Sequence, residues 1–287
     1  MSPSQALVAL TLFVIMLALG VGLEPGALGL ALRRPWLLGR LVLASCLLVP
    51  LLGLGLLTMP WTSSLPQSAR FAIALMAVCP SAPLTLHKVG LAGGNRQLAV
   101  VMQVCAAMVA ILSVPVVATW FSGSFGVEGW QIQPRHVALQ VLRAQLLPLG
   151  LGMLLRQQLP ALADRAEVHL DRLATGLVAL LVLLLLITAG PLLLPFALAN
   201  GLSVVAMATL VTLSLSLGAW MVPGRRQDRG TLALVMAMRN PGLALLLASD
   251  HANGLPGLRL AILLYLLVTV VLSVPVVQWQ RGQLAGG

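Results

Sequence analysis

Two apolar stretches of the sequence combine prolines with basic side chains. The first reads CPSAPLTLHKVG and the second reads MRNPGLA. The residues expected to break the helices there are Pro80, Pro83, Pro241 and Gly242. Because proline has no backbone N–H, a helix interrupted in this way leaves carbonyl oxygens without partners. Inside a membrane, such groups are tolerated only where they line a cavity or are buried in protein.

The side chains beside these breaks have the chemistry of an anion site. Lys88 is the only lysine in the chain. A basic residue at the centre of a membrane span costs roughly 2.5 to 3.5 kcal/mol on insertion scales, so an anion, carbonyl groups or water must compensate it. The expected substrate-binding residues are Thr85, His87, Lys88, Arg239 and Asn240. We therefore predict that an organic anion binds where the two breaks lie.

Each basic residue also has a plainer interpretation. The Lys88 side chain could extend to the cytoplasmic end of its span, and Arg239 could face a water-filled crevice. For His87, a structural hydrogen bond is as good an interpretation as a proton relay or a ligand contact. The acidic residues fall in expected loops or at span ends. Proton coupling would therefore depend on His87, or on Asp250 with His251 if that pair faces the pathway.

The composition places these residues in a membrane. Of 287 residues, 59% are hydrophobic and 8% are charged, whereas roughly a quarter are charged in soluble domains. The formal net charge is +10, but the basic residues stand between apolar runs, which indicates membrane orientation and excludes nucleic acid as a partner. The three cysteines show no paired spacing and no neighbouring ligand cluster, so we predict neither disulfides nor a metal site.

Apolar runs of about 20 residues predict an all-α polytopic protein with about nine transmembrane helices. The expected spans are residues 5–22, 36–57, 66–91, 95–121, 133–156, 170–195, 199–222, 229–250 and 257–280. No basic residue precedes the first run, so we interpret it as a span and not a signal peptide. Arginines concentrate on one side of this arrangement, which predicts an outside N-terminus and a cytoplasmic C-terminus in a bacterial-type cytoplasmic or plasma membrane.

A repeated motif suggests internal symmetry. Residues 111–120 read ILSVPVVATW and residues 271–279 read VLSVPVVQW, and the same offset brings Pro80 close to Pro241. Corresponding helices would be five spans apart, which implies opposite orientations in the membrane; chance similarity between apolar segments is the alternative. The predicted repeats within the single domain 1–287 are residues 1–122, with helices one to four, and residues 130–287, with helices five to nine. Inverted repeats with broken helices indicate a secondary transporter.

At these residues the chain resembles the bile acid:sodium symporter family. The matching positions are Cys79-Pro80, Ala92, Gly94-Asn95, Leu98, Asn240 and Gly242-Leu243-Ala244. The resemblance runs from ALGVGLEP through the last span. It implies a panel domain of helices one, five and six and a core domain of the others, with the third and eighth helices crossing at their breaks. It also implies an alternating-access cycle and the absence of the family's usual first helix.

The positions that bind sodium in that family differ in this chain. Where the family has a carboxylate and, four residues later, a glutamine, this chain has Val235 and Arg239. The family's Ser-Asn pair corresponds to Thr85 and Leu86. The positions where sodium ligands are expected to be lost are Ser45, Leu86, Ala99, Gln103, Val235 and Arg239. We therefore predict no metal site, consider sodium doubtful, and expect Lys88 and Arg239 to act as fixed cations.

Together these features predict a secondary transporter or facilitator of an organic anion, with sodium-independent operation as a further hypothesis. The alternative is a transport-inactive binding or sensor protein on the same scaffold. An intramembrane enzyme would need a nucleophile with its base, or paired acids, at membrane depth, and the sequence has no such pattern. The expected partners are a small organic anion and the lipid bilayer, and no cofactor is predicted.

Overall fold

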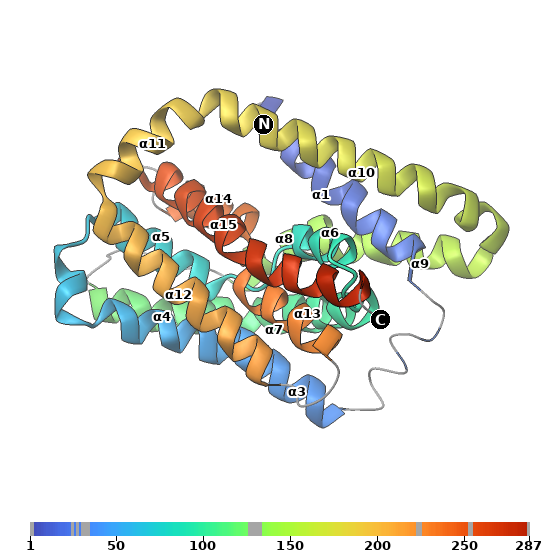
Figure 1. Ribbon diagram of the computed structural model, residues 1–287, viewed down its shortest axis with the longest axis horizontal. Coiled ribbons are helices and arrows are strands. Elements are labelled where there is room, and N and C mark those ends of the chain that lie inside the picture. The colour runs from blue at the N-terminus through green and yellow to red at the C-terminus, as the bar shows by residue number, and fades with distance from the viewer. Residues whose placement is uncertain are drawn as a thin grey trace.

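The computed structural model describes residues 3–23, 26, 29, 35–125, 134–221, 226–251 and 255–285. These residues are almost entirely helical, and one isolated β-bridge is the only strand-like pairing among them (Figure 1). In chain order the helices are α1 (Pro3–Val21), α3 (Pro35–Leu43), η1 (Ala44–Leu48), α4 (Val49–Leu57), η2 (Pro60–Ser64), α5 (Gln67–Val78), α6 (Pro83–Leu91), α7 (Arg96–Phe125), α8 (Pro134–Val141), η3 (Leu142–Leu146), α9 (Leu147–Gln158), α10 (Pro160–Thr188), α11 (Gly190–Ala199), α12 (Gly201–Trp220), α13 (Arg226–Ala237), α14 (Pro241–His251) and α15 (Leu258–Ala285).

Several of these helices are suited to a bilayer. Five described helical stretches are long and apolar enough to cross a membrane: Pro35–Leu57, Arg96–Trp120, Arg135–Gln158, Gly201–Trp220 and Leu258–Gly282. Large apolar side chains also lie exposed on the outside of the bundle, as at Leu194 and Leu198 of α11. Such surfaces are expected where lipid is the solvent. The all-α, multi-pass class is thereby confirmed, while the count of nine spans and the inverted repeats stay predictions.

Both predicted breaks are present. The span expected at residues 66–91 is divided into α5 and α6, and the span expected at 229–250 is divided into α13 and α14. The helix expected at 170–195 differs more, since α10 already begins at Pro160 and ends at Thr188. Proline suits the first helical position because its missing N–H would have no partner there.

Prolines also explain two π-helical turns, η1 and η3. Each is followed after one residue by a proline, Pro50 or Pro148. Because a proline cannot donate to the carbonyl four residues earlier and its ring clashes with it, the preceding turn widens. Val49 N–H accordingly donates to the carbonyl of Ala44, five residues back. Turns of this kind are rare and often occur at functional sites.

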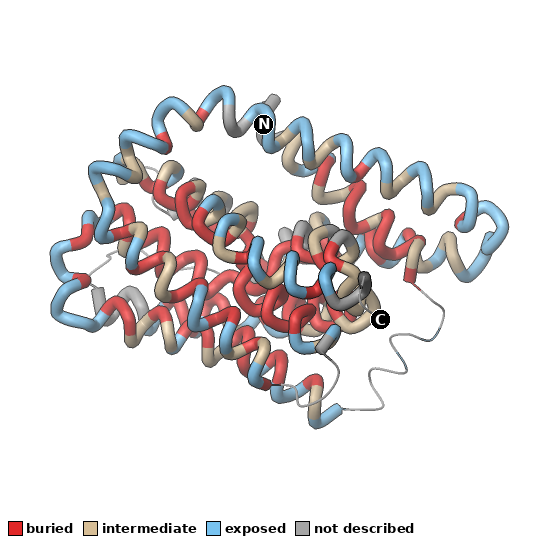
Figure 2. The backbone as a smooth tube through the Cα atoms, viewed as in Figure 1, coloured by how far each residue is buried: buried red, intermediate tan, exposed pale blue. Residues whose placement is uncertain are grey.

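Two groups of helices are named after the division that the family resemblance implies, although α8 and α11 of the first group also contact α7 and α15 of the second. We call α1, α8, η3, α9, α10 and α11 the panel, and the remaining helices the core. Within the panel, α1 packs tightly on α9, since a Cβ at Gly20 would lie 2.2 Å from the Leu149 carbonyl and one at Gly152 would lie 2.4 Å from that of Leu17. Small residues permit such close helix contacts in membranes. Figure 1 shows α10 lying along α1, and Figure 2 shows that α10 and α11 are largely exposed.

Candidate functional site at the helix crossing

The two broken helices cross at their breaks and bind each other through the backbone. Ala82 N–H donates to the Met238 carbonyl at 2.9 Å, and Asn240 N–H donates to the Pro80 carbonyl at 2.9 Å. Ser81 and Arg239 form the antiparallel β-bridge between these two bonds. The breaks therefore satisfy part of each other's free backbone groups, as polar groups buried in a membrane protein must.

The ends of four half-helices meet around this crossing. Helices α6 and α14 begin there, each with a proline in its first turn, and Asn240 caps α14 because its Oδ1 accepts the Leu243 N–H at 3.1 Å. Helices α5 and α13 end at the same place. Helix N-termini carry partial positive charge and C-termini carry partial negative charge with free carbonyls. The crossing can therefore hold both an anion and a cation.

The cation at this crossing is the side chain of Arg239, which is only 1% exposed. Its Nε donates to the Met76 carbonyl at 3.2 Å, and its two terminal nitrogens donate to the carbonyls of Ala77 at 2.8 Å, Met236 at 3.4 Å and Ser45 at 2.9 Å. One terminal nitrogen also donates to Ser45 Oγ at 3.1 Å. The guanidinium is thus surrounded by oxygens from the last turns of α5 and α13 and from η1.

This environment of Arg239 consists of neutral oxygens. In the described part of the chain, no carboxylate contacts the guanidinium. A buried charge is normally costly unless it is paired or hydrogen-bonded. Here carbonyl dipoles stabilise the charge, as they would stabilise a bound metal cation.

The structure brings three of the five predicted binding residues together. Thr85 Oγ1 donates to the Met238 carbonyl at 3.2 Å, so Thr85, Arg239 and Asn240 all lie at the crossing. Lys88 instead contacts α15, where its Nζ donates to Ser273 Oγ at 2.6 Å and to a neighbouring carbonyl at 3.4 Å.

Some predicted groups lie outside the described parts of the structure. The backbone of His87 belongs to α6, but its side chain is outside the described residues. The same holds for the side chains of Pro83, Asp250 and His251, although the backbones of these residues lie in α6 and α14.

Three of the positions matched to the family's sodium ligands carry apolar side chains. Leu86, Ala99 and Val235 are buried and offer no side-chain oxygen. Ser45 is occupied with Arg239, whose guanidinium fills the space between the carbonyls. Sodium is a hard cation that needs several oxygen ligands. The loss of the sodium site stays a prediction.

Two polar residues that the sequence analysis did not select complete the site. Ser81 Oγ donates to Gln103 Oε1 at 2.5 Å, and Gln103 Nε2 donates to the Ser81 carbonyl and to Gln145 Oε1, both at 2.9 Å. Ser81 was visible as the polar residue between the first pair of prolines, and Gln145 as an amide within an apolar span. A small cavity beside them leaves about 10 Å³ open to the centre of a water molecule.

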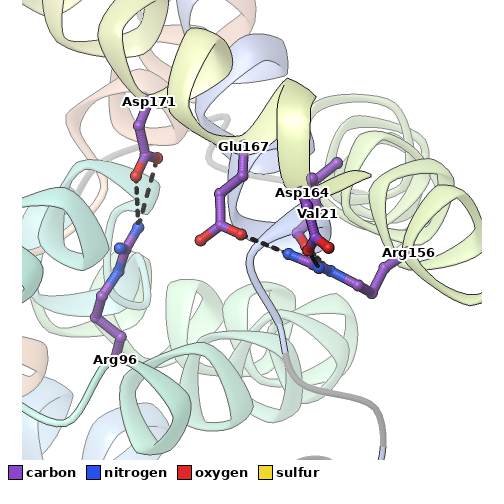
Figure 3. Close-up of polar contacts among 6 residues, drawn as sticks. All are labelled: Val21, Arg96, Arg156, Asp164, Glu167 and Asp171. Atoms are coloured by element: carbon purple, nitrogen blue, oxygen red, sulfur yellow. Dashed lines mark hydrogen bonds and ion pairs between the residues drawn. The ribbon is translucent and has the colours of Figure 1, made fainter. Parts of the chain in front are cut away.

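At one end of the bundle, charged residues join the panel helices to one another and to the core (Figure 3). Arg156 of α9 donates to the Val21 carbonyl of α1 and pairs with Asp164 and Glu167 of α10. Arg96 at the start of α7 pairs with Asp171 of α10 at 3.5 Å. The cluster of Arg156, Asp164 and Glu167 lies inside the panel, whereas the Arg96–Asp171 pair connects the core to the panel.

The neighbouring loop fixes the start of α7 within the core. Asn95 Oδ1 accepts the Leu98 N–H at 3.0 Å, its Nδ2 donates to Asp228 Oδ1 at 2.9 Å, and its backbone N–H donates to Thr231 Oγ1 at 2.8 Å. A Cβ at Gly94 would lie 2.7 Å from that Thr231 oxygen, so only glycine fits. The Gly94-Asn95 motif thus attaches the loop to α13.

Membrane-length apolar helices, two broken helices that cross through backbone pairing, and a buried charge at the crossing define a polytopic membrane protein of the transporter class. The chain belongs to the Sodium Bile acid symporter family, whose model matches residues 9–196. This match confirms the resemblance seen in the sequence.

Curated relatives agree with this family. The chain is 24% identical over 243 residues to a protein of Oryza sativa subsp. japonica named "Probable sodium/metabolite cotransporter BASS2, chloroplastic", covering 83% of this chain and 55% of that protein. It is 28% identical over 180 residues to "Sodium/bile acid cotransporter 4" of Homo sapiens, covering 61% of this chain and 40% of that protein. The chain thus spans about half the length of the curated relatives it matches.

Proposed function

We propose that this protein carries a small organic anion across a membrane by alternating access and does so without sodium. The observation that carries the proposal is the position of Arg239. Its guanidinium is fully buried at the helix crossing and is hydrogen-bonded to four backbone carbonyls and one hydroxyl. We further propose that the protein has no enzymatic activity.

Sodium independence follows from the covalent attachment of this cation. A sodium ion that binds at such a crossing can leave on the other side of the membrane, and its gradient can then drive the substrate. The Arg239 guanidinium supplies the same positive charge to the same kind of oxygens but cannot leave. The cycle would therefore be driven by the anion gradient and the membrane potential, as in a facilitator.

The preference for an anion follows from the charges at the crossing. Arg239 and the N-termini of α6 and α14 make this region positive, and no described carboxylate contacts the arginine. Helix N-termini at membrane depth bind anionic groups in transporters with discontinuous helices. Because the contacts of Arg239 are with the protein itself, we propose that it attracts the anion through its field while backbone N–H groups and Thr85 and Asn240 provide direct contacts.

The charge pattern of the sequence indicates the membrane and the orientation of the chain in it. We place the protein in a bacterial-type cytoplasmic or plasma membrane, with an outside N-terminus and a cytoplasmic C-terminus, because the arginines concentrate between alternate spans.

Uptake into proteoliposomes tests the proposal. Taurocholate, benzoate and p-toluenesulfonate would represent bile acids, small carboxylates and sulfonates, with tetraethylammonium as a cation control. We expect uptake of at least one anion at the same rate in sodium and in potassium media, and no uptake of the cation. Uptake that requires sodium would overturn sodium independence. Binding of an anion without any flux would instead favour the transport-inactive sensor.

A further inference from the structure

The amide side chains of Gln103 and Gln145 form a buried bridge between the core and the panel. Gln103 lies on α7 and is 2% exposed, and Gln145 lies in η3 and is 5% exposed. The bridge is the hydrogen bond from Gln103 Nε2 to Gln145 Oε1, at 2.9 Å. On the core side it continues to Ser81, inside the first helix break.

In this arrangement the Gln103 side chain has no donor to spare. Its amide nitrogen carries two hydrogens, of which one goes to the Ser81 carbonyl and the other to Gln145. Its oxygen accepts the Ser81 hydroxyl. Of these three bonds, only the one to Gln145 crosses from the core to the panel. Relative movement of the two groups would therefore break that bond and leave one amide hydrogen of Gln103 free.

Gln103 and Gln145 are among the residues that line the small cavity between the two groups. The panel contributes Met16 and Leu149 to its walls, and the core contributes Leu86 and Val100. Its volume is about 10 Å³ for water centres, which suffices for about one water molecule and not for an organic anion. An anion can enter here only when the panel and the core separate, which is the step that breaks the amide bridge.

We propose that Gln103 is a substrate-binding residue and that Gln145 competes with the substrate for it. This inference rests on the proposed transport function and deepens it. In the conformation of the structure, Gln145 Oε1 accepts the Gln103 hydrogen and holds the panel against the core. In the loaded protein, an oxygen of the anion accepts the same hydrogen, and the bridge stays open.

The lining of the cavity indicates the class of anion. Gln103 and Gln145 are among the lining residues, and the surface that faces the cavity is apolar while the two amides bond to each other. The ligand that suits these walls is an amphipathic oxyanion, with a carboxylate or sulfonate oxygen facing Gln103 and an apolar body facing Leu86 and Leu149. A strongly hydrated, polyhydroxylated anion would leave its hydroxyls without partners along those walls, at a cost for each one.

The proposal predicts opposite effects from the two members of one hydrogen bond. Methionine is an unbranched, amide-free replacement of similar size for glutamine. Gln145→Met removes the competing acceptor, so the KM for the anion falls about tenfold, the scale expected from a buried donor left unpaired in the empty state. Gln103→Met removes the donor itself, so the KM rises by a similar factor. A purely structural bridge would shift both variants in the same direction.

The experiment measures the initial uptake rates of benzoate and taurocholate against concentration, in wild type, both single variants and the double variant. Gln280→Met is the matched control, because Gln280 is also a buried amide hydrogen-bonded to a carbonyl but lies on α15, away from the cavity. We expect its KM to equal that of wild type. Melting temperatures of all variants in detergent show which of them fold.

The outcomes separate this inference from the proposed function. If wild type transports an anion and the two variants shift KM in opposite directions, the proposal holds. If wild type transports but both variants raise KM, or neither changes it, Gln145 is no competitor and the proposal is overturned while the transport function stands. If wild type transports no anion, both fail. If Gln103→Met does not fold, Gln145→Met alone tests the proposal. A lower KM in Gln145→Met supports it, and an unchanged or higher KM overturns it.

Discussion

Arg239 and Ser45 are joined by two hydrogen bonds although 194 residues separate them in the chain, one to the Ser45 hydroxyl at 3.1 Å and one to its carbonyl at 2.9 Å. The carbonyl is directed at the guanidinium from a π-turn, and that turn exists because Pro50 cannot donate to the helix. A proline in one membrane helix thus helps to stabilise a charge in another.

This relationship predicts that Arg239 is essential for stability as well as for transport. Arg239→Met would leave the carbonyls of Met76 and Ala77 and the Ser45 hydroxyl buried without donors, at about 1 to 3 kcal/mol for each unsatisfied group. We expect a large drop in melting temperature in detergent. The control is Arg165→Met on the exposed surface of α10, which should melt as wild type does. Equal melting of the two variants would show that the hydrogen bonds of Arg239 contribute nothing.

A second prediction concerns a variant in which the family's sodium ligands are restored at positions 235 and 239. The resemblance places a carboxylate at position 235 and a glutamine at position 239, so Val235→Glu combined with Arg239→Gln removes the fixed cation and returns two sodium ligands. We expect this double variant to gain a melting-temperature rise with sodium that potassium does not produce. Val235→Gln with Arg239→Gln is the uncharged control. A sodium effect equal in both would show that the carboxylate is not the ligand that matters.

The ion pair between Arg96 and Asp171 predicts a conformational effect. It joins the core to the panel, and both side chains are partly exposed, so its stabilising contribution is about 0 to 1 kcal/mol. Arg96→Glu should open that end of the bundle, and we expect faster labelling by a thiol reagent of a cysteine introduced at Met16, a residue that lines the interface cavity. Combining it with Asp171→Arg should restore the slow labelling of the parent.

The matched control for that prediction is the panel's own cluster. Arg156→Glu disrupts contacts among α1, α9 and α10 only. It should lower the melting temperature without changing the labelling rate at position 16. If Arg156→Glu changes the labelling as much as Arg96→Glu does, the Arg96–Asp171 pair has no special role between core and panel.

The tight crossing of α1 and α9 gives a prediction about packing. A methyl group added by Gly152→Ala would lie 2.4 Å from the Leu17 carbonyl, so the two helices must separate. Overpacking of this kind costs about 1 to 3 kcal/mol. Gly150→Ala, two residues earlier, meets nothing within 4 Å and should leave the melting temperature unchanged. Similar melting of the two variants would contradict the close packing within the panel.

The fold could be predicted from local features of the sequence. Apolar length indicates membrane helices, and prolines within apolar runs indicate breaks, so the divisions of α5 from α6 and of α13 from α14 were foreseen. The π-turns were not foreseen, although Pro50 and Pro148 cause them, because a proline in a helix can also produce a kink.

The site was harder to predict because its contacts are distant in sequence. That Arg239 would lie at a break could be read from its neighbours, but its partners at Ser45, Met76 and Ala77 depend on how three helices pack. Lys88 was expected in the same site, yet it contacts α15. Two residues along a helix correspond to a rotation of about 200°, so Lys88 faces away from Leu86, which lines the interface cavity.

Thermal unfolding across a sodium series tests our proposal that Arg239 occupies the place of sodium. The purified protein would be melted in detergent with potassium or choline holding the ionic strength constant. A ligand present at about 100 times its Kd stabilises the folded state by about 2.7 kcal/mol. We predict no difference in melting temperature between sodium and potassium. A rise specific to sodium would contradict the claim, because it would show that an ion site exists beside the buried guanidinium.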